Sequence, residues 1–372
     1  MPQTTANGVT IHYEDHGNPS DPAMLLIMGF GAQLTLWPDE LVEALVGHGF
    51  RVIRYDNRDV GLSQKFTGQK ASGPVKLTLL KKIGLTPRVP YTLADMAEDA
   101  VGLMDALEIE RAHIVGASMG GMIAQHVAAK HADRCLSFTQ IFSTTGNPKL
   151  PAARKEALQA LVKRPDSTEE AALVAHGMHL ARTIGSPAYP AEEERLRERV
   201  EASIRRSFYP EGGTRHLAAI LADGDRRGIV RGITVPTLVL HGEDDPLVPC
   251  EGGRDTAACI PGAMIRTLPG WATTCRWNWS TSLPMRSPDT PIRPPECPPR
   301  FDNCGRGFDR CATASAPLLP AKIFSRIHFR SCAHHKSSLV HASLRCSLMT
   351  HRHPAGPGRV KTLFTLLRPD PV

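Results

Sequence analysis

"HIVGASMGGMIAQH", residues 113–126, joins a short apolar run to a segment of helical period through Gly116-Ala117-Ser118-Met119-Gly120. The run before the serine has the composition of a buried strand, and the apolar residues after it recur at three- and four-residue intervals, as on a helix. A serine on such a strand-to-helix turn occupies strained backbone, and the residues two before and two after it must be small because larger side chains collide with the neighbouring elements. The pattern predicts a nucleophile elbow, with Ser118 as nucleophile and Gly116 and Gly120 as its small neighbours. The alternative is a glycine-rich helix start that contains an ordinary serine.

Strand-like and helix-like segments alternate on both sides of this stretch. Short β-branched or apolar runs are separated by segments with apolar residues at three- and four-residue intervals. This alternation predicts an α/β fold with a doubly wound, mostly parallel sheet that helices cover on both faces. The predicted strands are 23–29, 50–56, 112–118, 236–242 and 264–270, and the predicted helices are 37–49, 92–109 and 120–132.

The alternation stops between residues 148 and 231, where the chain is charged and helical, as in "AEEERLRERVEASIRRSF" (191–208). An insertion of this size between two strands is expected to form a helical cap over the ligand-binding end of the sheet. We therefore expect a core of residues 1–147 and 232–271, a cap of residues 148–231, and a separate tail of residues 272–372.

The tail has a different composition from the body. Residues 1–270 contain 29 Lys+Arg and 32 Asp+Glu, whereas residues 271–372 contain 15 and 5, so the formal net charge of +7 describes neither part. The tail also holds 13 of the 31 prolines and six of the nine cysteines. This composition seldom builds helices, and we expect a largely disordered segment.

The body has the features of a cytoplasmic enzyme. No apolar run approaches the roughly 20 residues that a membrane helix requires, and "MPQTTANGVT" has neither a basic nor an apolar segment of a signal peptide. Cys135, Cys250 and Cys259 show no disulfide-framework spacing, which is typical of reduced thiols. We expect cytoplasmic localisation and no membrane partner.

Two further stretches supply groups that acyl transfer requires. The developing oxyanion needs backbone donors, and Met119 N–H, directly after the nucleophile, is one candidate. "LLIMGFGAQ" (25–33) offers Phe30 N–H as the second donor, unless this loop is an ordinary tight turn. "LVLHGEDDPLVP" (238–249) ends a strand with two acids, Asp244 and Asp245. One carboxylate there can orient a histidine, or both can merely shape the turn.

Taken together, these motifs resemble the α/β-hydrolase fold family from residue 8 to about residue 270. "GASMGG", "MGFG", "YDNRDVGLS" and "GEDDPLVP" occur in family order, and "LIMGFGAQLTLWPDEL" further resembles the esterase subgroup that includes methylesterases of polyketide antibiotics. The resemblance implies Asp245 as the acid, three residues after Gly242, and no metal or cofactor. Met28 replaces a histidine that many relatives carry. The turn residues Asp56, Arg58, Gly61 and Ser63 are expected to be structural.

The type of nucleophile limits the range of reactions that the family resemblance implies. A serine at position 118 excludes the dehalogenases and epoxide hydrolases of this fold, which place an aspartate there. The resemblance therefore implies hydrolysis of a small-molecule carboxylic ester, with lactonase and cofactor-free perhydrolase activity as alternatives. The oligomeric state is not indicated.

The general base of the family is missing. It usually follows the next strand as "PG-x-GH", but here "AMIRTLPG" (263–270) leads into "WATTCRWNW" (271–279), and no histidine follows before His328. Without a base, a serine hydrolase is badly impaired, and the alternative is a ligand-binding module without catalysis. Six histidines follow later in the chain, and one of them could in principle act as the base. Each lies at least 57 residues beyond the usual position of the base; they are His328, His334, His335, His341, His351 and His353.

A one-base deletion explains this departure. With a GC-rich choice of codons, restoring one G after the codon for Trp271 changes the reading to Trp-Gly-His-Asp-Leu-Pro-Leu-Glu-Leu-Val-Asp-Glu. The missing Gly-His-Asp and the start of a closing helix return together. We hypothesise that the chain from residue 272 is an out-of-frame product. Loss of the closing helix would expose an apolar sheet face and favour aggregation.

Two other interpretations of the tail have less support. Its charge could attract nucleic acid, but the arginines are scattered and no recognisable motif interleaves aromatic residues with them. Cys297, Cys304 and Cys311 with His334 and His335 could suggest zinc, but the spacing lacks the close cysteine pairs of zinc sites. We expect neither partner.

Overall fold

A sheet of eight strands forms the centre of the protein in a computed structural model, which describes residues 2–73, 76–77, 79–80 and 88–273. The predictions for the chain after residue 273, including the disordered tail, lie outside these residues. The strands are β1 (Gln3–Ala6), β2 (Val9–His16), β3 (Ala23–Ile27), β4 (Arg51–Tyr55), β5 (Ala112–Ala117), β6 (Cys135–Ile141), β7 (Thr237–Gly242) and β8 (Met264–Leu268).

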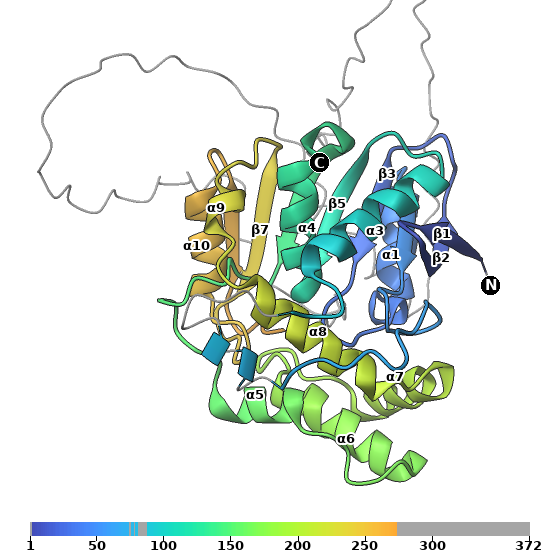
Figure 1. Cartoon of the computed structure of the whole chain (residues 1–372), viewed down its shortest axis with the longest axis vertical. Coiled ribbons are helices and arrows are strands. Elements are labelled where there is room, and N and C mark those ends of the chain that lie inside the picture. Colours follow the sequence, from blue (N-terminus) through green and yellow to red (C-terminus); the bar gives the residue numbers. More distant parts are fainter. Residues whose placement is uncertain (1, 74–75, 78, 81–87, 274–372) are drawn as a thin grey trace, which may run out of the picture. The chain divides into compact units, whose positions relative to one another are not determined.

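The strands lie in the order β1-β2-β4-β3-β5-β6-β7-β8 (Figure 1). β1 pairs with β2 and β2 with β4 in antiparallel register, and every pair from β4 to β8 is parallel. The prediction of an α/β fold with a mostly parallel sheet is confirmed. Because the central strands are parallel, their carboxyl ends meet at one edge of the sheet, where ligands bind in such folds.

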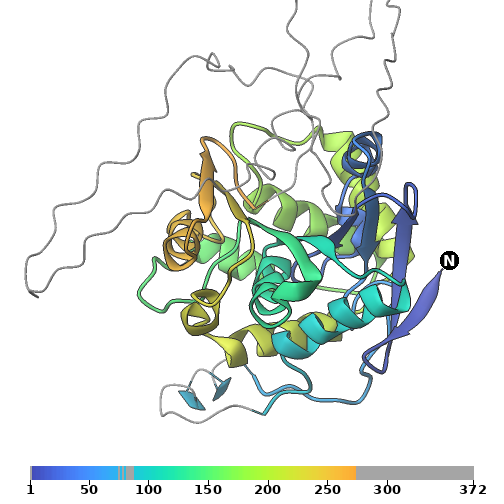
Figure 2. The same cartoon turned by 90° about the horizontal axis from the view of Figure 1, so that it is seen from above.

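Alternate residues of the central strand β3 face two separate hydrophobic cores. In β3, Leu25 and Ile27 pack into one core, and Met24 and Leu26 pack into the other. The first core includes α3 (Leu93–Ala106) and α4 (Met119–Lys130), and the second includes α1 (Asp39–Gly47). Figure 2 shows these helices on opposite sides of the sheet. A strand covered on both faces needs apolar residues at every position, which explains the continuous run "AMLLI".

Four helices follow between β6 and β7 and form most of the segment expected to be the cap. They are α5 (Lys155–Val162), α6 (Glu170–Thr183), α7 (Glu193–Arg206) and α8 (Pro210–Asp223). Figure 1 shows them together beyond one end of the sheet. α6 and α7 share a small core of their own, made by Val174, Met178 and Leu196. The chain then returns through α9 (Arg227–Val230), β7 and α10 (Glu251–Cys259) to β8.

Over the described part of the chain, no helix is long and apolar enough to cross a membrane. The three cysteines there, Cys135, Cys250 and Cys259, are free thiols.

Candidate active site

Ser118 is the single residue between β5 and α4. Its backbone has φ 54° and ψ −121°, a left-handed conformation that side chains disfavour. The surrounding structure holds it there, since Ser118 N–H donates to the carbonyl of Ile141 on β6 at 2.9 Å. The sharp turn directs the hydroxyl away from the sheet, and within the described residues this hydroxyl has no hydrogen-bond partner.

Gly116 and Gly120 allow the elbow to close. A Cβ atom on Gly116 would lie 2.2 Å from the carbonyl oxygen of Gly120, and one on Gly120 would lie 2.1 Å from that of Ile27 on β3. No side chain tolerates such distances from backbone atoms. The two glycines therefore let the start of α4 pack directly on β3 and β5.

Two backbone donors lie beside the nucleophile. Met119 begins α4, so its N–H is one of the amides that a helix leaves unpaired. The loop after β3 approaches from the other side, because a Cβ on Gly29 would lie 3.0 Å from Ser118 Cβ. Within the resolved elements and loops up to residue 273, neither Phe30 N–H nor Met119 N–H donates to a protein acceptor. Both amides are free to bind an oxyanion.

The turn after β4 supports this loop. Asp56 accepts hydrogen bonds from Leu34 N–H and Leu62 N–H, both at 2.8 Å, and Asn57 Nδ2 donates to the carbonyl of Met28 at 2.8 Å. Gly61 packs directly against the Asp56 carboxylate, where a Cβ atom would collide. This turn therefore contributes to the position of the loop of residues 28–33, which carries Phe30 and is called the oxyanion loop below.

Buried ion pairs join the same turn to the cap. Arg206 of α7 lies 2.8 Å from Asp56, and Arg215 of α8 forms a bidentate pair with Asp59 at 2.7 and 2.8 Å. Arg58 turns the other way and pairs with Asp99 of α3. These ion pairs join residues that are far apart in the sequence, so the spacing of residues along the chain could not predict them.

The two acids after β7 have different surroundings. Asp244 is exposed and accepts the N–H of Gly270 at 2.7 Å, which ties the loop after β7 to the loop after β8. Asp245 is 5 % exposed, and its Oδ1 accepts from the N–H groups of Leu247 and Val248 at 2.9 and 2.8 Å. Its Oδ2 is buried and has no hydrogen-bond partner among the residues that the structure describes. Burial raises the pKa of Asp245 to about 6 despite these hydrogen bonds.

Thr273 occupies the place next to this carboxylate. Its hydroxyl donates to Asp245 Oδ1, and the preceding residue, Ala272, is fully buried and donates its N–H to Ser186 Oγ at 3.0 Å. Thr273 also lines the same cavity as Ser118. Thr273 was not among the predicted site residues, although it is the fifth residue of "PGWAT", the position of the histidine in "PG-x-GH".

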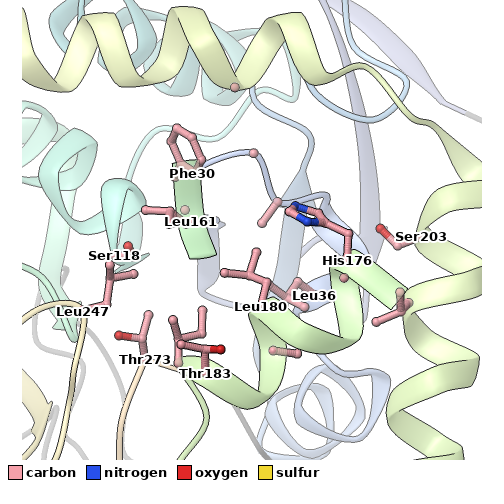
Figure 3. A pocket seen from close by; sticks show the side chains of 18 of the residues that line it. Phe30, Leu36, Ser118, Leu161, His176, Leu180, Thr183, Ser203, Leu247 and Thr273 are labelled. Carbon is pink, nitrogen blue, oxygen red and sulfur yellow. The ribbon is translucent and has the colours of Figure 1, made fainter. Parts of the chain in front are cut away.

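No histidine of the described chain hydrogen-bonds to Ser118 or Asp245. His241 of β7 contacts the carbonyl of Val248, and His126 of α4 contacts Asp223. His176 of α6 lines the cavity, but Figure 3 shows it toward the opposite end from Ser118. Within the described residues, the predicted nucleophile, oxyanion donors and acid are therefore present without a histidine bonded to either Ser118 or Asp245.

A cavity of about 1150 Å³ separates Ser118 from the cap helices. Figure 3 shows Ser118, Thr273 and Leu247 around one end, while Leu161, Leu180 and Leu36 line the apolar middle. The walls are mainly apolar, as is usual for small-molecule sites. Between residues 2 and 273, outside the three short gaps, no group of three or more His, Cys, Asp or Glu side chains is arranged to hold a metal ion.

Comparison with known proteins agrees with this architecture. The model of the alpha/beta hydrolase fold family matches residues 22–271. The chain is 29 % identical over 283 residues to rhodomycin D methylesterase DnrP of Streptomyces peucetius, covering 70 % of this chain and 88 % of that protein. It is 24 % identical over 264 residues to 3-oxoadipate enol-lactonase 2 of Acinetobacter baylyi, covering 71 % and 86 %.

A solved structure is similar as well. The enol-lactonase from Burkholderia xenovorans LB400 is 28 % identical, with a TM-score of 0.53 and coverage of 72 % of this chain and 91 % of that one. The family model matches more than half of the chain, and the sheet order and strand-elbow-helix turn agree with it. The chain belongs to the α/β-hydrolase fold family.

Proposed function

We propose that this chain carries the acyl-transfer site of a carboxylic ester hydrolase from which the general base is missing. Ser118 is the nucleophile, and the N–H groups of Phe30 and Met119 form the oxyanion hole. Asp245 is the acid that would orient a base, and Thr273 occupies the base position. The substrate is a small-molecule ester, as supported by similarity to a methylesterase and to enol-lactonases.

One observation carries this proposal. Within the described part of the chain, the buried Asp245 has one carboxylate oxygen without a hydrogen-bond partner, and its other oxygen is bonded by Thr273, which shares a cavity with Ser118. An isolated buried carboxylate is unfavourable unless something pairs with it. An imidazole between Asp245 and Ser118 would supply that partner and accept the serine proton.

The unchanged chain is expected to hydrolyse esters very poorly. In serine hydrolases, loss of the base lowers kcat by about 10⁶, and residual catalysis comes from the oxyanion hole and binding alone. Robust hydrolysis of a chromogenic ester that Ser118→Ala abolishes would contradict this expectation.

The substitution Thr273→His tests the proposed site directly. A histidine at position 273 starts from a backbone that already places its side chain against Asp245, so we expect ester hydrolysis to rise at least about 100-fold over the unchanged chain. The measurement is the steady-state rate with a p-nitrophenyl ester. Thr273→Gln, which is similar in size but not a base, is the matched control.

Two double variants complete this test. Activity gained by Thr273→His should disappear with Ser118→Ala and fall strongly with Asp245→Asn. A folded Thr273→His variant without any gain in activity would contradict the assignment of Thr273 to the base position.

A ligand-binding module is the second candidate, favoured by the intact cavity beside a site without a base. Such a module would gain thermal stability with its ligand, and its Ser118 would not react with a serine-directed fluorophosphonate even after Thr273→His. Covalent labelling of Ser118 in the Thr273→His variant, identified by mass spectrometry, distinguishes the two functions.

A further inference from the structure

We propose that His216 of cap helix α8 is a positioning residue that aims the Phe30 amide of the oxyanion loop at the substrate. This role rests on the proposed function, because it assumes that Phe30 N–H binds an oxyanion. If His216 has this role, the direction of the Phe30 amide depends on the position of the cap helix α8.

His216 bridges two parts of the core. Its Nδ1 accepts a hydrogen bond from Gly31 N–H at 3.2 Å, and its Nε2 donates to the carbonyl of Arg58 at 2.9 Å. The side chain is fully buried, with its ring edge-on to Phe30 at 6.3 Å and to Tyr91 at 6.2 Å. Burial lowers the pKa of His216 to about 4, so the neutral ring accepts at one nitrogen and donates at the other at neutral pH.

The hydrogen bonds of the loop explain how this contact acts on Phe30. Gly29 C=O accepts from Ala32 N–H at 3.3 Å, and in a trans peptide the following N–H, that of Phe30, points in the opposite direction. The next peptide is held by its Gly31 N–H on His216. With the peptides on both sides of Phe30 constrained, its amide direction is set. Gly31 has φ +61°, a conformation that glycine adopts without strain.

α8 is itself held firmly against the core. Arg215, next to His216, makes the bidentate pair with Asp59, and a Cβ on Gly213 would lie 3.6 Å from the Phe30 ring, at ordinary contact distance. The hydrogen bond between His216 and Gly31 therefore joins the firmly held helix α8 to the centre of the oxyanion loop, which has few other hydrogen bonds among the described residues. Loss of the imidazole would remove the acceptor of Gly31 N–H, and the peptide that follows Phe30 would lose the hydrogen bond that holds it.

The experiment uses the full chain with Thr273→His, which supplies the base that the proposed function finds missing, as the parent for all variants. Labelling of Ser118 by a fluorophosphonate probe is followed by intact mass. In this reaction the bond from Ser118 Oγ to phosphorus forms, the phosphorus–fluorine bond breaks, and fluoride and the hydroxyl proton pass to solvent. The phosphoryl oxygen takes the oxyanion position. Saturation of the rate with probe concentration separates the maximal labelling rate from the half-saturating concentration.

Three variants make the test specific. His216→Leu removes both hydrogen bonds. His216→Asn keeps an acceptor near the position of Nδ1 and should restore the contact with Gly31. His126→Leu is the matched control, because His126 also joins α8 to the core, through Asp223 at 3.0 Å, but does not touch the oxyanion loop.

We expect His216→Leu to lower the maximal labelling rate at least about tenfold and to change the half-saturating concentration less than about twofold, because donor orientation matters in the transition state. His216→Asn should recover most of the rate, and His126→Leu should label like the Thr273→His parent. Equal labelling of His216→Leu and the parent would overturn this inference and leave the proposed function standing. Equal losses in His216→Leu and His126→Leu would also overturn it. No labelling of the folded Thr273→His parent would overturn the proposed function, and the inference with it.

Discussion

Asp244 and Asp245 are adjacent and have identical side chains, but the fold gives their carboxylates different burial and different hydrogen bonds. Asp244 remains exposed while it accepts the N–H of Gly270, whereas Asp245 is buried and has one oxygen without a partner. Both acids are apparent in the sequence, but the difference in burial is not. It depends on Leu247, Val248 and Thr273, which pack around only one of them.

The raised pKa of Asp245 predicts a pH-dependent stability. Its pKa is about 6 in the folded chain and about 3.9 in unfolded chains, so the folded state binds more protons between these values. The contribution of Asp245 to the free energy of unfolding therefore falls as pH rises from about 4 to about 6, and stays low above that. Asp245→Asn should raise the free energy of unfolding at pH 8 by up to about 3 kcal/mol.

Urea unfolding at pH 8 and pH 4 checks this prediction. At pH 4 the variant should have no advantage, because Asp245 is then mostly protonated in the folded chain. Asp244→Asn is the control, since Asp244 is exposed and its amide replacement can still accept the Gly270 N–H. The same gain at both pH values would contradict the assigned cause.

Some site residues follow from the sequence and others do not. The motifs point to Ser118, Phe30, Met119 and Asp245. Ser118 and Phe30 line the cavity, Met119 directly follows Ser118, and Asp245 is bonded to Thr273, which lines the same cavity, although their catalytic roles remain predictions. Thr273 and His216 were not found. Thr273 shows no chemical signal of its own, and His216 lies 185 residues from its partner Gly31, a pairing that only the folded cap creates.

Among the elements, the strands and helices with continuous apolar runs or clear helical period were predicted to within about two residues. β6 was missed because its sequence "CLSFTQI" mixes apolar and polar residues. Its polar side chains are buried and satisfied; for example, Gln140 bonds to Gln125 of α4 at 2.6 Å. Periodicity of hydrophobic residues does not detect such a strand. β1 and β2 were missed as well, as was α10.

The junction of β5 and α4 makes a prediction at the scale of elements. Gly116→Ala and Gly120→Ala each place a Cβ about 2 Å from a backbone oxygen of a neighbouring segment, and the helix cannot move away without disrupting the packing on β3. We expect each substitution to lower the free energy of unfolding by about 3 kcal/mol or more. Chemical denaturation monitored by circular dichroism measures this change.

Gly47→Ala is the matched control for these two variants. Gly47 lies in α1 with open space around its Cβ position, so alanine there should be neutral or should stabilise by up to about 1 kcal/mol. If Gly116→Ala and Gly47→Ala had similar effects, the close approach of α4 to the sheet would not be what requires glycine.

At the scale of the whole molecule, the sheet ends at β8, which pairs only with β7 among the described strands. Ile265 on this strand is 40 % exposed. Edge strands with exposed apolar side chains favour association. The restored reading frame would add an apolar and acidic helix start directly after this point, together with the missing histidine.

The hypothesis of a one-base deletion predicts an additional base in the source DNA between the codons for Leu268 and Pro284. Direct sequencing decides this. The restored chain should hydrolyse esters in a Ser118-dependent manner and remain monomeric in light scattering at concentrations where the unchanged chain associates. If the DNA confirms the present reading, the tail is genuine and the hypothesis is wrong.

The strained backbone of Ser118 also has a consequence for how this chain would evolve. A non-glycine residue at φ 54° costs a fold about 1–3 kcal/mol, and glycine would relieve this strain. In a lineage without catalysis, drift and selection for stability would both erode such a turn, since nothing would then maintain serine there. Among the described residues, this chain keeps the strained serine, both flanking glycines and the buried Asp245, with no histidine bonded to either Ser118 or Asp245. On the proposed function, a recent loss of the base would leave this combination.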